Sequence, residues 1–260
     1  MKRMKFAALA LALISMVGLS SCLDGSGNST GTVYSIMKVN QTYGNVYFTT
    51  PGSDVKYVPS NTLNLTTNSA LAWVYGEYNS DEISATSKQV PLANVKCDPL
   101  KEISVGDEAS NQLVSCEIPD DVVTNQKVMF WGTTNDYCVV AMYYYVQLAN
   151  GKLETTEINK HNFYVYANPE EDLKDGVLTV HLRHTINGLS LGDKDIKDVY
   201  TSRVGSYMYF NMNYFKHMTG TDGKGVSKIK IAYQKTSTVT LNPTVAETVS
   251  EEFSLNKANN

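Results

Sequence analysis

Residues 188–192, Gly-Leu-Ser-Leu-Gly, match the Gly-x-Ser-x-Gly pattern that carries the nucleophilic serine of α/β-hydrolases. That pattern works where a strand enters a sharp turn and then a helix, with an acid and a histidine later in the chain. Here Ser190 is followed by a polar stretch, residues 193–198, and then by another β-prone run. The sequence therefore predicts no catalytic serine and no other catalytic residue. A hydrolase whose site is assembled from residues distant in sequence is the alternative.

Asp193, Asp195 and Asp198 could offer oxygen ligands to a calcium ion. Calcium takes about six to eight oxygens, usually from a loop with a glycine turn and a distal glutamate. These features are missing, so a solvated loop is expected. No two cysteines have the short ligand spacing of a structural zinc site, and no phosphate-binding glycine loop or dinucleotide fingerprint occurs. The sequence thus predicts no metal and no cofactor.

Thr179, His181 and Arg183 alternate along a β-prone run, residues 177–184. Successive side chains of a strand point to opposite faces, so these three share one face and Leu178, Val180 and Leu182 share the other. His184 falls on the face opposite His181, so the two cannot bind one metal as neighbours. His184 is expected to hydrogen-bond in the core or a loop. Thr179, His181 and Arg183 form either a binding patch or an ordinary solvated face.

Tyrosines alternate along three more β-prone runs and could line one face of a sheet. Such a face could stack against sugar rings, or its rings could simply pack against one another across the strands. Both interpretations are open for Tyr143 and Tyr145, which we take as candidate binding residues. The other members of the set are Tyr164, Tyr166, Tyr207 and Tyr209.

Short runs rich in Val, Thr and Tyr, without a long apolar stripe of helical period, predict an all-β protein. Residues 32–104 contain five such runs, with a turn signal at Pro51-Gly52-Ser53-Asp54, and are predicted to form a small OB-like barrel. Residues 105–126 are polar and are predicted to be a linker. The longer runs of residues 127–260 predict an antiparallel β-sandwich.

Two local signals stand out in the second region. Asn150-Gly151 is the dipeptide most typical of a tight hairpin turn. Asn168-Pro169-Glu170-Glu171 predicts one helical turn, with asparagine as the N-cap, proline at the first position and a glutamate three residues after the cap. Gly176 is expected to end that helix.

The N-terminal segment carries a basic start and an apolar run, residues 6–17, which is shorter than the roughly 20 residues that span a bilayer. These features are typical of a secretory signal. Leu19-Ser20-Ser21-Cys22 resembles the lipobox of bacterial lipoproteins, which implies lipidation of Cys22 and removal of residues 1–21. Residues 22–31 are small and polar and predict a flexible tether. We therefore expect a lipid anchor in the membrane of the cell envelope, at the outer membrane, facing the periplasm or the surface. An ordinary secretory signal is the alternative.

The chain has 260 residues and a net charge of −4; without residues 1–21, 19 basic and 26 acidic residues remain and the charge is −7. A net-negative chain without a basic cluster lacks the electrostatic footprint of nucleic-acid binding, so nucleic acid is excluded as a partner. Besides Cys22 the chain contains Cys97, Cys116 and Cys138. Export to an oxidising compartment allows a disulfide between Cys97 and Cys116; otherwise all three are buried thiols.

Four segments carry a family resemblance: residues 21–24, 71–78, 137–145 and 175–184, the last followed by Gly192-Asp193. With these segments the chain resembles the NigD-like lipoproteins of Gram-negative gut anaerobes, although the stretch 185–191 is longer than the usual spacing. The resemblance implies an N-terminal OB-like domain, a C-terminal β-sandwich and no established reaction. The family's name comes from a bacteriocin gene cluster, which implies immunity or envelope binding. We therefore predict a non-enzymatic binding module for a glycan, an envelope protein or a bacteriocin.

Overall fold

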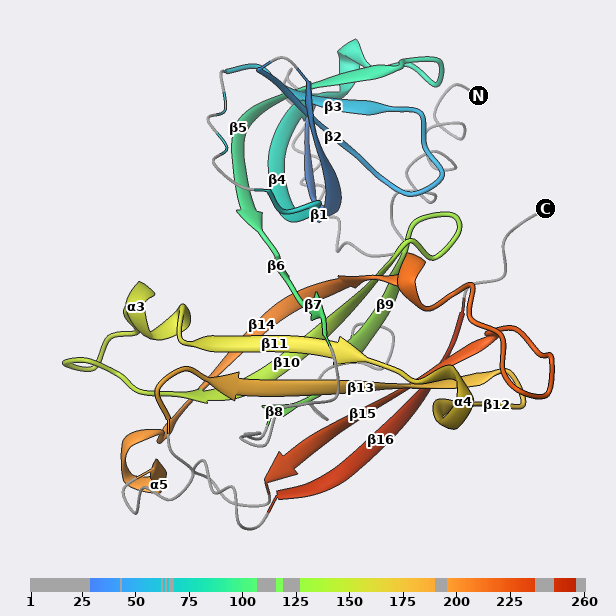
Figure 1. The fold of residues 1–260 in the computed structure, drawn as a ribbon. Coiled ribbons are helices and arrows are strands. Elements are labelled where there is room, and N and C mark those ends of the chain that lie inside the picture. Colours follow the sequence, from blue (N-terminus) through green and yellow to red (C-terminus); the bar gives the residue numbers. More distant parts are fainter. Residues whose placement is uncertain are drawn as a thin grey trace. The chain divides into compact units, whose positions relative to one another are not determined.

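The structure is a computed structural model that describes residues 29–42, 44–61, 63, 65, 68–106, 116–118, 127–189, 196–236 and 246–255. Cys22, the signal segment, most of the predicted linker and Ser190 to Asp195 lie outside the described residues. The chain forms two compact units, and the boundary between them along the sequence falls between Leu100 and Lys101 (Figure 1). Strands dominate both units, which confirms the all-β prediction. No helix in the described ranges is long and apolar enough to cross a bilayer.

The first unit is a closed barrel of five strands in the order β1-β2-β3-β5-β4. All neighbouring strands are antiparallel except β3 and β5, which run parallel. A five-stranded closed barrel of this kind confirms the predicted OB-like domain. The strands are β1 (Thr30–Thr42), β2 (Asn45–Thr49), β3 (Lys56–Pro59), β4 (Leu71–Asn79) and β5 (Gln89–Pro99), and a 3-10 turn, η2 (Ser80–Glu82), follows β4.

Alternate residues of these strands point into the barrel and form its core. Gly76 on β4 has a special part in this packing, because a Cβ there would lie 2.9 Å from Leu92 Cδ1. Only glycine therefore lets β4 approach the side chain of Leu92. The buried core residues are Met37, Phe48, Tyr57, Ala72, Val74, Val90 and Leu92.

The second unit contains two sheets. The β10 sheet has the order β6-β14-β10-β8, with β9 also paired to β10, and the β13 sheet has the order β16-β15-β13-β11-β7, with β12 also paired to β13. The β10 sheet comprises β6 (Lys101–Glu102), β8 (Cys116–Glu117), β9 (Val128–Trp131), β10 (Tyr137–Val146) and β14 (Ser202–Asn211). The β13 sheet comprises β7 (Ser104–Val105), β11 (His161–Tyr166), β12 (Leu173–Lys174), β13 (Val177–Ile186), β15 (Lys228–Thr236) and β16 (Ala246–Ser254).

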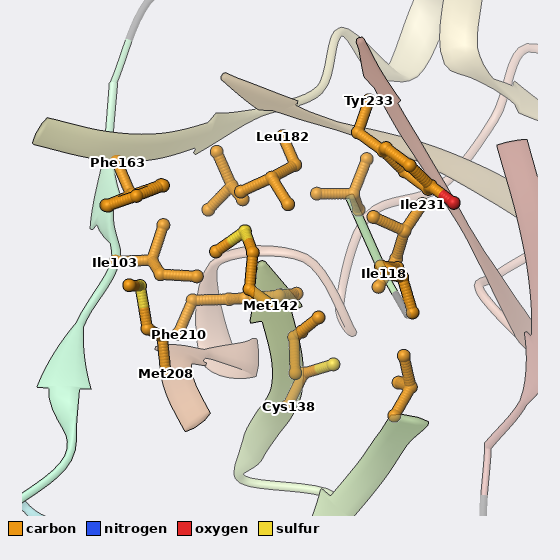
Figure 2. Packing of buried hydrophobic residues seen from close by; sticks show 14 of the residues in the cluster. Ile103, Ile118, Cys138, Met142, Phe163, Leu182, Met208, Phe210, Ile231 and Tyr233 are labelled. Atoms are coloured by element: carbon orange, nitrogen blue, oxygen red, sulfur yellow. The ribbon is translucent and has the colours of Figure 1, made fainter. Parts of the chain in front are cut away.

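The inner faces of the two sheets pack against each other, as the predicted sandwich requires. Figure 2 shows Met142 of the β10 sheet close to Leu182 of the β13 sheet, and both belong to one buried core. The prediction of purely antiparallel sheets is too simple, because β6–β14, β7–β11 and β13–β15 are parallel pairs. Hydrophobic alternation fixes which face of a strand is buried, but it does not fix the direction of the neighbouring strand.

The segment that follows the barrel joins both sheets. β6 pairs with β14, and β7, only two residues later, pairs with β11. Ile103 lies between β6 and β7 with 1% of its surface exposed, and its N–H donates to the Tyr209 carbonyl at 2.7 Å. Residues 101–105 thus provide an edge strand to each sheet and a side chain to the core between them.

The predicted hairpin turn at Asn150-Gly151 is confirmed. Both residues have positive φ, 53° and 75°, and the flanking Ala149 and Lys152 form a β-bridge. Positive φ at both central residues is the requirement of the turn that an Asn-Gly pair serves.

The predicted helical turn is α4 (Pro169–Asp172), and Asn168 caps it by accepting from the Glu170 N–H. The reciprocal acceptor for the Asn168 N–H is Asp172, at 2.8 Å. The prediction that Gly176 ends this helix is wrong, because the helix ends at Asp172. Asp175 and Gly176 instead form a tight turn with φ of 52° and 78° between β12 and β13. The remaining short helices are α3 (Thr155–Ile158), α5 (Ile196–Val199) and η3 (Met212–Tyr214).

Cys97, Cys116 and Cys138 are free thiols in the structure, which corresponds to the second of the two alternatives that the sequence leaves open. Each side chain packs in the apolar core of its own unit: Cys97 against the barrel core, Cys116 and Cys138 in the sandwich core. Burial raises the pKa of Cys97 to about 11 and that of Cys116 to about 12. The reactive thiolate is therefore scarce at both positions near neutral pH.

Candidate functional site

Thr179, His181 and Arg183 lie together on the outer face of β13, where burial alternates along the strand. The structure shows how they are held. His181 Nε2 lies 2.7 Å from Asp172 Oδ1, and the imidazole stacks on Tyr166 with ring centroids 4.8 Å apart. Arg183 Nη2 donates to the Tyr166 hydroxyl at 3.1 Å. His181 and Arg183 thus belong to one hydrogen-bonded set with Asp172 and Tyr166, and Thr179 lies on the same face of β13.

The sequence allows the tyrosine set to line one face of a sheet. The structure does not place all of its members on one face, because their strands belong to two sheets. Tyr143 and Tyr145 lie on the outer side of β10, half buried, whereas Tyr164 and Tyr166 lie on β11 in the other sheet. The guanidinium of Arg203 covers the ring of Tyr143 at 4.1 Å from its centroid. Tyr143 is therefore occupied by cross-strand packing, and the two candidate tyrosines are not neighbours of the β13 patch.

His184 lies in the core, as expected, and belongs to a buried polar chain that the sequence did not reveal. His161 Nδ1 lies 2.9 Å from His184 Nε2, and His161 Nε2 lies 3.1 Å from Glu157 Oε1. All three side chains are buried, and Phe163 stacks on His184 with ring centroids 4.3 Å apart. The four-residue spacing between Glu157 and His161 is the only trace of this chain in the sequence.

The protonation of this chain follows from its contacts. Burial raises the pKa of Glu157, but hydrogen bonds from the Gln147 N–H, Lys160 and His161 outweigh burial, and the net pKa lies below its usual value. Burial, together with the positive charges of Lys101 and Lys160, lowers the pKa of His161 by more than Glu157 raises it. An ionised Glu157 accepts from His161 Nε2–H, so His161 Nδ1 must accept from His184 Nε2–H. The chain joins the carboxylate of Glu157 to two imidazoles among aromatic rings, and it serves the core rather than a ligand.

The feature best suited to binding is a hollow of about 640 Å³ on the outside of the barrel. We call it the barrel hollow. Strands β1, β4 and β5 supply its walls, and the alternation of β4 places Trp73, Tyr75 and Glu77 on this outer side. Tyr34, 51% exposed, stacks on Trp73 with ring centroids 4.8 Å apart and an interplanar angle of 16°. The lining residues are Tyr34, Trp73, Tyr75, Glu77, Asn94, Val95, Lys96 and Asp98.

Glu77 is held in a fixed position in the barrel hollow. The Tyr75 hydroxyl donates to its Oε1 at 2.8 Å, and Asn94 Nδ2 donates to its Oε2 at 2.7 Å. These hydrogen bonds, first that from Asn94 and then that from Tyr75, lower the pKa of Glu77. Among the described residues, no cation forms an ion pair with Glu77. The hollow thus presents an ionised carboxylate, which the Tyr75 hydroxyl and the Asn94 amide hold in one orientation.

Asn94 reaches Glu77 because the backbone is distorted at this point. The pairing of β4 and β5 shifts register between Tyr75 and Glu77, and Asn94 has a φ of 51° in the left-handed region. Such irregularities re-aim side chains and are common next to binding sites. This site was not predicted from the sequence. The alternation of Trp73, Tyr75 and Glu77 indicates a shared face, but it does not reveal the register shift or the positive φ of Asn94.

Two substitutions at Asn94 should separate its backbone role from its hydrogen bond. Asn94→Gly removes the amide but tolerates positive φ, so the free energy of unfolding of the barrel should change by less than about 0.5 kcal/mol. Asn94→Ala removes the same amide and places a Cβ in the left-handed region, which costs about 1–2 kcal/mol. Urea unfolding followed by Trp73 fluorescence, in a Trp131→Phe background, measures both. Equal losses in the two variants would contradict a strained backbone at residue 94.

No three His, Cys, Asp or Glu side chains in the described ranges gather closely enough to hold a metal ion. Ser190, Asp193 and Asp195 lie outside those ranges, and Asp198 lies exposed on α5. The structure therefore offers two candidate sites, the β13 patch in the second unit and the unpredicted barrel hollow in the first. Of the two, the hollow alone combines exposed aromatic rings with a positioned carboxylate.

Comparison with protein-family models gives no match, and comparison with curated proteins gives none. Among solved structures, a candidate lipoprotein from Bacteroides fragilis matches with a TM-score of 0.67 and 16% identity, over 88% of this chain and 100% of that one. A NigD-like immunity protein from Bacteroides caccae matches with a TM-score of 0.47 and 11% identity, over 89% of this chain and 100% of that one. At these identities the first likeness establishes a shared fold.

Proposed function

We propose that this chain is a non-enzymatic binding module of the cell envelope and that it is anchored through Cys22. The module binds a neutral glycan in the barrel hollow. The observation that carries the proposal is the pairing of Tyr34 and Trp73 with a carboxylate fixed by Tyr75 and Asn94. Binding sites for small ligands typically combine aromatic walls with a few placed polar groups. The lipobox-like sequence at Cys22 supports the anchor.

The chemistry of the hollow favours sugars. Aromatic faces are large, rigid apolar surfaces, on which the C–H face of a pyranose can pack. The Glu77 carboxylate can accept hydrogen bonds from sugar hydroxyls, and charge-assisted bonds of this kind are stronger than neutral ones. Glu77 and Asp98 carry two negative charges against the single positive charge of Lys96. An acidic glycan would meet a net negative wall, so a neutral glycan fits better.

The protonation of Glu77 argues for binding rather than hydrolysis. A glycosidase needs one carboxylic acid that still holds its proton, so that it can protonate the leaving oxygen. The hydrogen bonds from Asn94 and Tyr75 lower the pKa of Glu77, which is the opposite direction. Glu77 is therefore suited to accept hydrogen bonds from a bound sugar, and not to act as a general acid.

The test is affinity electrophoresis of the full mature chain through gels that contain neutral polysaccharides, such as xylan, mannan, laminarin and levan. We expect at least one to retard the protein, and Trp73→Ala to weaken that binding by at least about tenfold, or 1.4 kcal/mol. Tyr214→Ala is the matched control, because Tyr214 is an exposed aromatic residue outside the hollow, 60% exposed.

Glu77→Gln should weaken the same binding while leaving both tryptophans in place. The proposal fails if no neutral polysaccharide retards the wild-type chain. It also fails if Trp73→Ala and Tyr214→Ala bind equally well to the polysaccharide that does.

A further inference from the structure

We propose a second binding site, on the outer face of β13 from Arg183 to Thr179, for the acid groups of an anionic polymer such as a carboxylated or sulfated glycan. This site is separate from the barrel hollow and does not depend on it. The shared ligand chemistry is a row of oxyanions, and arginine is the side chain best shaped to hold them.

Arg183 is held in place before any ligand arrives. Its guanidinium lies over the Tyr166 ring, 5.3 Å from the centroid, and its Nη2 donates to the Tyr166 hydroxyl at 3.1 Å. The same Nη2 lies 3.3 Å from His181 Nδ1. Stacking and hydrogen bonds fix the side chain, so less rotamer entropy is lost when an anion binds.

Both oxygens of Asp172, a carboxylate next to His181, already form hydrogen bonds. Asp172 Oδ1 binds His181 Nε2 at 2.7 Å, and its Oδ2 accepts from the Asn168 N–H at the start of α4. His181 in turn stacks on Tyr166 at an interplanar angle of 14°. Asp172 therefore orients His181, and His181 helps to orient Arg183. No carboxylate of the described residues lies within ion-pair distance of Arg183, so its guanidinium has no direct counter-ion among them.

Arg203 in the β10 sheet provides an internal comparison. It also covers a tyrosine on the outside of a sheet, Tyr143, at 4.1 Å. Unlike Arg183, it forms an ion pair, with Glu117 Oε1 at 2.6 Å. The chain thus contains the same arginine–tyrosine stack twice, once neutralised by a carboxylate and once not. The stack that lacks its carboxylate is the one that can take an anion from outside.

More donors continue along the face. Thr179 lies four residues from Arg183, or about 13 Å at roughly 3.3 Å per residue. Lys230 of β15 is paired in register with Thr179 and forms no ion pair with a described acid, since its other neighbour, Glu252, pairs with Lys228 at 2.8 Å. A charge at each end of this row, with the Thr179 hydroxyl beside Lys230, fits a polymer with repeated acid groups better than a single anion.

The test uses the full mature chain in affinity gels with polygalacturonate, dextran sulfate or uncharged dextran. We expect polygalacturonate or dextran sulfate, and not dextran, to retard the chain; the first distinguishes a carboxylate ligand and the second a sulfate ligand. Arg183→Gln should weaken this binding at least tenfold. Arg183→Lys should weaken it less, because lysine keeps the positive charge but lacks the paired N–H donors of the planar guanidinium. A thermal melt of Arg183→Gln near that of the wild type verifies that the variant is folded.

Arg203→Gln is the matched control and should bind as the wild type does. The proposal is overturned if neither polyanion retards the chain, or if Arg203→Gln weakens binding as much as Arg183→Gln. A net charge of −7 for residues 22–260 makes general attraction to a polyanion unfavourable, so such binding needs a local site. Trp73→Ala should leave polyanion binding unchanged; a loss there would place the polymer in the barrel hollow and overturn the second site.

Discussion

Replacement of Phe210 by alanine should lower the free energy of unfolding of the second unit by about 3–5 kcal/mol. Phe210 is fully buried and meets Phe215 edge-on, with ring centroids 5.8 Å apart. It lies among Met208, Met142 and Ile103 in the core between the sheets (Figure 2). Alanine would leave a cavity that side chains from two sheets cannot close without moving their strands.

Urea unfolding followed by Trp131 fluorescence measures this loss, because Trp131 is the single tryptophan of the second unit. A Trp73→Phe background removes the signal of the barrel. Tyr214→Ala, at an exposed aromatic residue nearby in sequence, should change the stability by less than about 0.5 kcal/mol. A loss below 1 kcal/mol for Phe210→Ala would mean that the core does not pack as described.

Replacement of His161 by alanine should cost about 3 kcal/mol, because it breaks a buried chain in the middle. Glu157 would lose a donor while it stays buried, and the His184 N–H that points to His161 would lose its acceptor. The matched control is His217→Ala, since His217 is an exposed histidine of the same unit. If both variants lose the same stability, the buried chain contributes nothing.

The same histidine should make the second unit sensitive to acid. In the folded state the pKa of His161 is lowered by burial, whereas the unfolded chain has the ordinary value near 6.5. The unfolded state therefore binds more protons as the pH falls below about 6.5, and stability is lost in that direction, by at most about 1.4 kcal/mol per pH unit for one site. Urea unfolding between pH 7.5 and 5 should show this slope in the wild type, and His161→Ala should reduce it.

Much of the architecture could be predicted because it depends on local pattern. The alternation of Leu178, Val180 and Leu182 fixes the buried face of β13, and Asn150-Gly151 fixes a turn by its own backbone preference. Strand partners could not be predicted in the same way. Tyr143 and Tyr164 alternate alike, but they belong to different sheets, because pairing depends on contacts between distant segments.

The sites follow the same division. The shared face of Thr179, His181 and Arg183 comes from strand period alone and was predicted. The barrel hollow needs strands β1, β4 and β5 to meet, and it needs Asn94 to adopt positive φ at a register shift. The buried chain needs α3 to bring Glu157 against the start of β11. These arrangements exist only after the chain has closed its barrel and sheets, so residue types and spacing did not reveal them.

The short strands β6 and β7 also determine how the second unit responds to mechanical force. In a chain anchored at Cys22, as proposed above, tension would enter this unit at Lys101, where β6 runs parallel to β14 and β7 runs parallel to β11. Tension along these strands loads their hydrogen bonds together, in shear, rather than opening them one after another. Ile103, buried between the two strands, must leave the core before either can slide. In an anchored chain, the segment that enters the sandwich would thus act as a mechanical clamp, because tension on it would load both sheets at once.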